Sequence, residues 1–139
     1  MDSETQREFD IVVYGATGFT GALVAQYFHE TPGDATWAIA GRSQNKLDAV
    51  KQRLDAPDLP TLVADSDSTE DMTRLAAQSR VIISTVGPYA RYGTTLLEAC
   101  AAEGTHYCDL TGEPQWMASV FERVSDAAEE SGARLIHCC

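Results

Sequence analysis

The chain has 139 residues, of which 44% are hydrophobic and 22% are charged, so it has the size and composition of one globular domain. Its 21 Asp and Glu residues outnumber 10 Lys and Arg residues, and the net charge of −11 argues against nucleic acid or an anionic membrane as a partner. No apolar run approaches the roughly 20 residues of a transmembrane segment, and the polar start lacks the apolar core of a signal peptide, so we expect a cytoplasmic protein.

The basic residues include only two lysines, Lys46 and Lys51. An acidic, lysine-poor surface is expected of a protein adapted to high salt, because screening suppresses the repulsion among carboxylates. An ordinary acidic protein is the alternative that the composition leaves open.

Short β-branched runs alternate with longer helical patterns along the chain, which predicts parallel strands joined by helical crossovers. An acidic N-terminal tail over residues 1–8, which we expect to be flexible, precedes a first strand over residues 9–14. A helix over residues 18–30 follows, and its apolar stripe consists of Leu23, Val24, Tyr27 and Phe28.

The middle of the chain repeats this alternation twice. Residues 37–40 form the second predicted strand, and Ser43 caps a helix that ends before Pro57. Residues 61–64 form the third strand, and a capping box at Ser68–Asp71 starts the next helix.

The near-continuous apolar run over residues 81–86 predicts a central strand that is covered on both faces. A second capping box at Thr95–Glu98 starts a helix that Gly104 ends. A fifth strand over residues 106–110 follows.

The last predicted helix runs from Pro114 to Gly132, and a sixth strand covers residues 133–139. The inward side chains of this helix are expected to be Met117, Val120, Phe121, Val124 and Ala128. Residues 9–139 should therefore form one α/β domain of the Rossmann type, a doubly wound parallel sheet of about six strands in the order 3-2-1-4-5-6 with helices on both faces. Because the chain stops inside or just after its last strand, we expect it to be a fragment of a longer protein.

Three glycines at three-residue spacing follow the first strand. Gly15 permits a sharp turn, Gly18 leaves room for a pyrophosphate beside the backbone, and Gly21 permits close packing of helix on strand. The N–H groups and dipole of the helix start attract the anion. The predicted cofactor-binding residues of this turn are Gly15, Thr17, Gly18, Phe19, Thr20 and Gly21. A turn that serves packing only is the alternative.

The residue after the second strand selects the cofactor in this fold, where a carboxylate favours NAD. No carboxylate occurs between Asp34 and Asp48, and Arg42, Ser43 and Lys46 occupy this stretch instead. The planar guanidinium of an arginine suits both a 2′-phosphate and the adenine face, so the sequence predicts NADP(H) in preference to NAD(H). A solvated arginine at a helix start is the alternative.

Further candidates follow the next strands. Asp65 either contacts the adenine amine or caps the next helix. The small residues that close the fourth strand would let the nicotinamide ribose lie against the main chain, and they are Thr85, Val86, Gly87 and Pro88.

A substrate could be met by Tyr89, Arg91 and Tyr92 on the following connection, where exposed packing residues are the alternative. Asp109 and Glu113 after the fifth strand could position substrate or transfer a proton, although helix capping by Glu113 is at least as well supported. Catalytic residues cannot be assigned from these patterns.

No metal site is expected, because neither the histidines nor the four cysteines have ligand spacing. We expect His29 and His137 to be structural, and the cysteines to be buried reduced thiols. The four cysteines are Cys100, Cys108, Cys138 and Cys139.

Four blocks in order resemble the saccharopine dehydrogenase-like oxidoreductase family, which includes trans-acting enoyl reductases. They are GATGFTG at residues 15–21, AGRS at residues 40–43, STVGPYARYG at residues 84–93 and HYCDLTGE at residues 106–113. The resemblance covers the whole chain but only the N-terminal NADP-binding domain of the family's longer proteins.

This resemblance implies an NADP-dependent oxidoreductase that transfers hydride to or from a small-molecule or acyl/lipid-type substrate. It also implies that a C-terminal domain holding this substrate follows Cys139, so the 139 residues alone should be inactive. A homo-oligomer is compatible with the sequence, which does not define one.

Two other functions are compatible with the glycine turn. A short-chain dehydrogenase or sugar-nucleotide epimerase would need a tyrosine four residues before a lysine, whereas Arg42 and Leu47 stand at that spacing before Lys46 and Lys51. A non-catalytic redox sensor that binds NADP would carry the same cofactor motifs as an enzyme.

Overall fold

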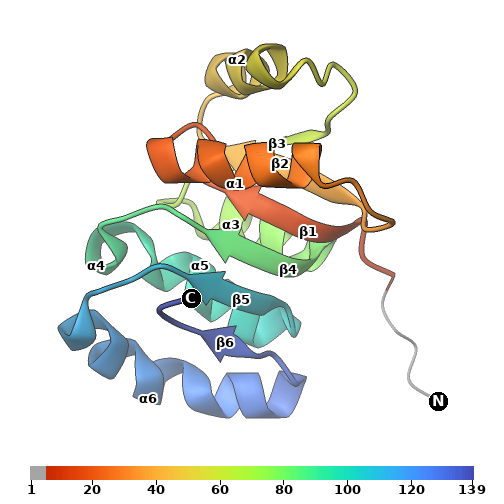
Figure 1. Cartoon of the computed structure of the whole chain (residues 1–139). Helices are drawn as coiled ribbons and strands as arrows, with labels where there is room; N and C mark the ends of the chain where they lie inside the picture. Colours follow the sequence, from red (N-terminus) through yellow and green to blue (C-terminus); the bar gives the residue numbers. More distant parts are fainter. Residues whose placement is uncertain (1–5) are drawn as a thin grey trace.

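The protein, studied as a computed structural model, is described over residues 6–139 and forms a three-layer α/β domain (Figure 1). The strands are β1 (Phe9–Tyr14), β2 (Trp37–Gly41), β3 (Thr61–Val63), β4 (Ser79–Ser84), β5 (His106–Asp109) and β6 (Leu135–Ile136). The helices are α1 (Phe19–Glu30), α2 (Gln44–Leu54), α3 (Thr69–Gln78), α4 (Tyr89–Tyr92), α5 (Thr94–Glu103) and α6 (Pro114–Ser131).

All six strands are parallel and lie in the order β3-β2-β1-β4-β5-β6, which confirms the predicted Rossmann-type fold. The central strand β1 pairs with both β2 and β4, and Val13 lies beside Ile39 on one side and Ile83 on the other. The chain therefore reverses direction across the sheet between β1 and β4, which is where ligands bind in open α/β sheets.

The two faces of the sheet carry separate cores, because right-handed crossovers place helices by the direction in which the chain moves across the sheet. The larger core packs α3, α5 and α6 against one face, with Val12, Ile82 and Tyr107 at its centre. The smaller core packs α1 and α2 against the other face around Val13 and Ile39.

The predicted flexible tail over residues 1–8 falls largely outside the described residues. Arg7 lies within them and is held in place. Its guanidinium donates to the carbonyl oxygens of Ala76 at 3.0 Å and Ala77 at 2.8 Å, and to that of Glu103. These carbonyls lie at the ends of α3 and α5, where the backbone lacks helical partners.

The start predicted for the helix that corresponds to α5 is wrong. The capping box at Thr95–Glu98 does not form, because Gly93 is the N-cap residue of α5 and Glu98 pairs with Arg123 on α6 instead. The sequence also misses α4, whose four residues are too few to show a helical period.

The faces of two helices also differ from the prediction. Leu23 and Tyr27 of α1 are 53% and 63% exposed, because Gly21 and Ala25 face the sheet and bring the helix close to it. On α6 the predicted inward Phe121 is 69% exposed, whereas Trp116, which was not predicted to face inward, is buried.

Two of the later strands, β4 and β6, end earlier in the chain than predicted. β4 ends at Ser84, so residues 85 and 86 leave the sheet, and β6 is reduced to Leu135–Ile136. The cysteines are free, but only Cys100 is buried, whereas Cys138 and Cys139 are exposed. No helix within residues 6–139 combines the length and apolar character needed to cross a membrane.

Candidate cofactor-binding site

The turn between β1 and α1 is fixed by two glycines that the fold itself requires. Gly15 has a φ of +90°, in the left-handed region that glycine tolerates best, and a Cβ there would lie 2.7 Å from Thr85 and Val86. A Cβ on Gly21 would lie 2.0 Å from the Gly15 carbonyl oxygen. Both positions therefore exclude side chains for reasons of packing alone.

Gly18 is different, because the fold does not require it. Its φ of −83° and ψ of 173° are accessible to any residue, and the nearest atom to a Cβ would be the Gly15 carbonyl oxygen at 3.5 Å. The space in front of Gly18 is open, as expected where a ligand approaches the backbone. Packing alone does not explain a glycine here.

The start of α1 has the character of an anion site. Gly18 is the N-cap residue and provides no side-chain cap, and no acidic residue lies in the first turn. The first N–H groups of a helix have no intrahelical acceptor and carry the positive end of its dipole. Thr17, Phe19 and Thr20, which flank this helix start, are all exposed. A phosphate fits this position.

The end of β4 is fastened to the same turn. Thr85 Oγ1 donates to the carbonyl oxygens of Tyr14 at 3.1 Å and Gly15 at 3.3 Å. The chain then passes through a cis Gly87–Pro88 peptide bond into α4. Of the four predicted residues, Thr85 and Val86 are thus brought beside the glycine turn at the sheet's switch point, and Gly87 and Pro88 continue the chain to the start of α4.

A pocket of about 240 Å³ opens between the carboxyl ends of β1 and β2. Its lining contains two cationic side chains and no carboxylate. It is lined by Tyr14, Gly15, Thr17, Gly41, Arg42, Ser43, Lys46, Ser66, Val86 and Tyr92.

The cationic side of this pocket is built by the β2–α2 connection. Ser43 caps α2, accepting a hydrogen bond from the Lys46 amide at 3.4 Å, so Arg42 and Lys46 lie around a helix start. Arg42 is exposed and forms no ion pair within residues 6–139. A helix start, a hydroxyl and two cations together suit a phosphate group.

Three pocket residues, Tyr14, Gly41 and Ser66, were not predicted as site residues. The Tyr14 hydroxyl donates to the Ala64 carbonyl oxygen at 3.2 Å, and burial raises the pKa of Tyr14 to about 12, so this phenol is neutral. The position of Tyr14 at the end of β1 was the available signal, because strand ends form the ligand-binding edge.

Asp65 neither lines this pocket nor caps α3, which Ser68 caps instead. Its carboxylate accepts a hydrogen bond from the Asp67 amide at 2.9 Å, and its own amide donates to Asp71 at 3.0 Å. The structure therefore assigns Asp65 to the local turn after β3, and its neighbour Ser66 faces the pocket.

The structure places Tyr92 in this pocket and away from Asp109 and Glu113, with which it was grouped as a substrate-side residue. The Arg91 guanidinium lies 4.8 Å from the centre of the Tyr92 ring and pairs with Asp67 at 2.9 Å. This ion pair joins α4 to the β3–α3 loop, so Tyr92 and Ser66 lie on the same side of the pocket.

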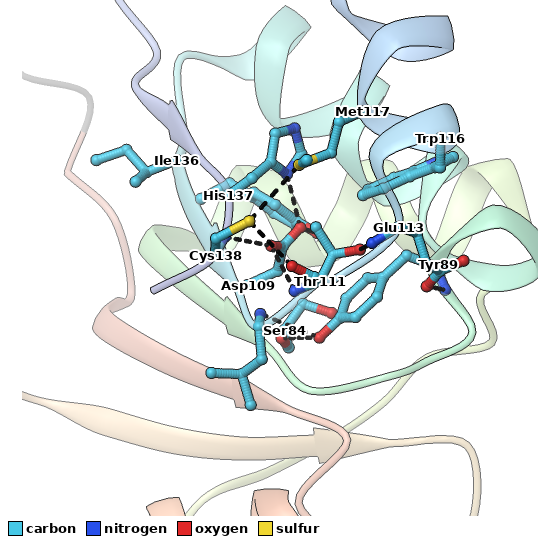
Figure 2. A network of polar contacts seen from close by, with 12 residues as sticks. Ser84, Tyr89, Asp109, Thr111, Glu113, Trp116, Met117, Ile136, His137 and Cys138 are labelled. Atoms are coloured by element: carbon cyan, nitrogen blue, oxygen red, sulfur yellow. Dashed lines mark hydrogen bonds and ion pairs between the residues drawn. The ribbon is translucent and has the colours of Figure 1, made fainter.

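Tyr89 and Glu113 lie where the β4–α4 connection meets the β5–α6 connection, as Figure 2 shows. The Glu113 carboxylate accepts hydrogen bonds from the amides of Tyr89 at 2.7 Å and Ala90 at 3.1 Å, which caps α4 and not α6. The Tyr89 hydroxyl donates to the Ser84 carbonyl oxygen at 2.9 Å, and its buried ring stacks on Trp116. Both side chains therefore join the β4–α4 and β5–α6 connections.

The Asp109 carboxylate is buried and fully engaged (Figure 2). Asp109 Oδ2 accepts from the Tyr107 hydroxyl at 2.7 Å and lies 2.8 Å from His137 Nδ1. Asp109 Oδ1 accepts from the amides of Thr111 at 3.1 Å and Cys138 at 3.2 Å. The Asp109 side chain thus joins the end of β5 to the residues that follow β6. His137 takes part in this contact, in agreement with the structural role that we expected for it.

Within residues 6–139, no three His, Cys, Asp or Glu side chains come together as a metal site would require. At the switch point, polar groups of the glycine turn and of the β2–α2 connection line the pocket. The arrangement can hold a diphosphate at one helix start and a further phosphate at the other.

Known proteins match the chain along its whole length. It is 47% identical over 137 residues to a provisionally named trans-acting enoyl reductase of Mycobacterium tuberculosis. The alignment covers 97% of this chain and 33% of the relative. It is 43% identical to the trans-acting enoyl reductase of Mycobacterium ulcerans over 99% of this chain and 33% of the relative. The chain therefore spans about a third of the length of these relatives.

Solved structures share the fold at low sequence identity. Saccharopine dehydrogenase (L-Glu forming) from Saccharomyces cerevisiae superposes with a TM-score of 0.71 at 14% identity, over 93% of this chain and 26% of that one. The triphenylmethane reductase of Citrobacter sp., solved with NADP(H), gives 0.66 at 18% identity, over 93% and 48%.

The sequence also matches the saccharopine dehydrogenase NADP binding domain over residues 11–136, which is nearly the entire described fold. Both helix starts at the pocket, strands β2 to β6 and all of β1 except its first two residues lie within this match. The chain belongs to the saccharopine dehydrogenase NADP-binding domain family.

Proposed function

We propose that this domain binds NADP(H) in preference to NAD(H) and is the cofactor-binding part of a longer oxidoreductase. The observation that carries the proposal is the pocket wall formed by Arg42, Ser43 and Lys46 beside the glycine turn, without any carboxylate. A carboxylate at this place would accept hydrogen bonds from the ribose hydroxyls of NAD and repel a 2′-phosphate.

Different parts of the site bind different parts of the cofactor. Gly18 and the first N–H groups of α1 face the pyrophosphate, because the backbone of the glycine turn is open at Gly18 and closed at Gly15 and Gly21. Arg42 and Lys46 bind the 2′-phosphate at the start of α2. Tyr92, which shares the pocket lining with Arg42, contacts the adenosine, and this revises its predicted place at the substrate.

The nicotinamide end lies along Thr85, Val86, Gly87 and Pro88, beyond the glycine turn. When bound, NADP(H) supplies the hydride chemistry, and the chain's own residues bind and orient it. Tyr89, Asp109 and Glu113 support this edge of the sheet through the contacts that join its connections. They act as structural residues in this proposal.

The substrate is a small molecule or an acyl or lipid-type group, held by a part of the protein outside these 139 residues. The names of the mycobacterial relatives, of which the chain spans a third, support this proposal. The 139 residues should bind cofactor without turnover, since they supply neither substrate positioning nor exclusion of water.

The test is calorimetric titration of Arg42→Ala with NADPH and with NADH. Loss of hydrogen bonds to a charged group should weaken NADPH binding by about 1.5–3 kcal/mol, roughly 10- to 150-fold, and leave NADH binding almost unchanged. Arg53→Ala is the matched control, because Arg53 lies exposed in the last turn of the same helix, outside the pocket. Equal losses for both cofactors would contradict the assignment of Arg42 to the 2′-phosphate.

A further inference from the structure

On one face of the sheet, β4, β5 and β6 are not covered by helices of the described residues. The smaller core draws its strand residues from β1 and β2 only, and within residues 6–139 no residue of β4, β5 or β6 joins it. In Figure 1, α3 and α5 lie behind the sheet, and no helix lies in front of β4, β5 and β6. Parallel sheets are ordinarily covered on both faces.

Register identifies the side chains on this face. Val13, which belongs to the smaller core, pairs with Ile83, Ile83 pairs with Cys108, and Cys108 pairs with Ile136. Paired residues of a sheet point to the same side. This row of paired side chains therefore begins on β1, where α1 and α2 cover the face, and continues across the uncovered strands β4, β5 and β6.

The row is apolar and incompletely buried. Ile83 and Cys108 are half-buried, and Ile136 is 53% exposed. On the opposite face, the neighbouring residues Ile82 and Tyr107 are 0% and 1% exposed. A hollow of about 440 Å³ lies at the amino ends of β1, β4 and β5, where Ile11 and Val81 meet the polar side chains of Asp10, Asp34, Arg80 and His106.

We infer that this face is the docking surface for the remainder of the longer polypeptide, which covers β4, β5 and β6 with an amphipathic segment. The inference rests on the proposed function in so far as both require a longer protein. We define the docking face by Val81, Ile83, Cys108 and Ile136.

Three observations favour this occupant. The relatives are about three times as long as the chain, so their homologous domain belongs to a larger protein. The backbone of Cys139 donates to the Asp109 carbonyl oxygen at 2.7 Å, so a continuing chain would emerge beside β5, at the edge of the docking face. A second copy is disfavoured because each copy carries a net charge of −11 and the two would repel.

A segment that covers β4 and β5 along their length would extend to the carboxyl edge of these strands. Residues Thr85–Pro88 leave the sheet at that same edge, next to the glycine turn. The docking face would therefore set the position of the substrate-holding part relative to the cofactor.

The test compares Ile136→Asp in the 139-residue chain and in the polypeptide encoded by the complete reading frame. In the short chain this exposed position should tolerate the charge, with a change in thermal midpoint within about 2 °C. In the longer polypeptide we expect a fall of more than about 5 °C and faster hydrogen exchange over β5 and β6. Phe121→Asp is the matched control, because Phe121 is also apolar and exposed but lies on α6.

Equal shifts for Ile136→Asp in the two polypeptides would overturn the inference, as would a reading frame that ends at Cys139. A dimer of the short chain that Ile136→Asp converts to monomer would also overturn it, in favour of a second copy. NADPH affinity, measured separately for the unmodified protein, distinguishes failure of the proposed function, since the thermal and exchange measurements need no cofactor.

Discussion

Replacement of Gly18 and of Gly21 should have opposite consequences, because only one of these glycines is required by the fold. A Cβ on Gly18 would meet nothing closer than 3.5 Å, so Gly18→Val should cost about 1 kcal/mol, the effect of a poorer N-cap residue. For a domain of this size that is a fall of roughly 3–5 °C in thermal midpoint.

Gly21→Ala should destabilise the domain much more. The added Cβ would lie 2.0 Å from the Gly15 carbonyl oxygen, and backbone at a tight turn cannot move aside as a side chain can. The higher helix propensity of alanine adds about 1 kcal/mol to the free energy of unfolding, whereas overpacking lowers it by up to about 3 kcal/mol and occasionally more. Because a contact of 2.0 Å with backbone lies at or beyond the upper end of this range, we expect a net loss of about 2 kcal/mol or more.

Circular dichroism melts and calorimetry with NADPH measure both effects. Gly18→Val should remain folded and bind NADPH at least tenfold more weakly, because the valine side chain occupies the approach of the pyrophosphate. A folded Gly18→Val protein with unchanged NADPH affinity would refute the reasoning, since the turn would then serve packing alone.

Three further predictions concern stability. Glu113→Ala should lower the free energy of unfolding by about 1–3 kcal/mol in denaturant melts, because two amides at the start of α4 lose their acceptor, and Glu113→Gln should recover part of the loss. The hydrogen bond from the Asp65 amide is the main reason that the pKa of Asp71 lies below its ordinary value of 3.8, so the folded state gains stability above that value and loses it as the pH falls below. Melts between pH 5 and about 2 should show a shallower decline for Asp71→Asn, and an unchanged slope would contradict this. If the acidic surface reflects adaptation to salt, the thermal midpoint should rise toward molar KCl, where the Debye length is about 3 Å, whereas a flat or falling midpoint would indicate ordinary acidity.

Features with a local cause could be predicted from the sequence. The strand order follows from alternation of apolar runs and helices, and the turn at Gly15 follows from glycine spacing. The caps at Ser43 and Ser68 were likewise predicted, because each bonds an amide only three residues away.

Features with a distant cause could not be predicted in this way. Tyr92 reaches the pocket because Arg91 pairs with Asp67, which is 24 residues away. The Glu113 carboxylate lies a similar distance along the chain from the amides that it caps, so local patterns suggested the wrong helix. Phe121 was predicted to face inward and is nevertheless exposed, because the buried stripe of α6 consists of Trp116, Val120 and Val124, and Phe121 lies about 100° from Val120 around the helix.

Titration of the unmodified chain with NADPH and NADH under identical conditions tests the central claim most directly. The wall of Arg42, Ser43 and Lys46 predicts NADPH affinity at least tenfold higher than NADH affinity, a difference of about 1.4 kcal/mol or more. Equal affinities, or a preference for NADH, would contradict the account of this pocket as a 2′-phosphate site.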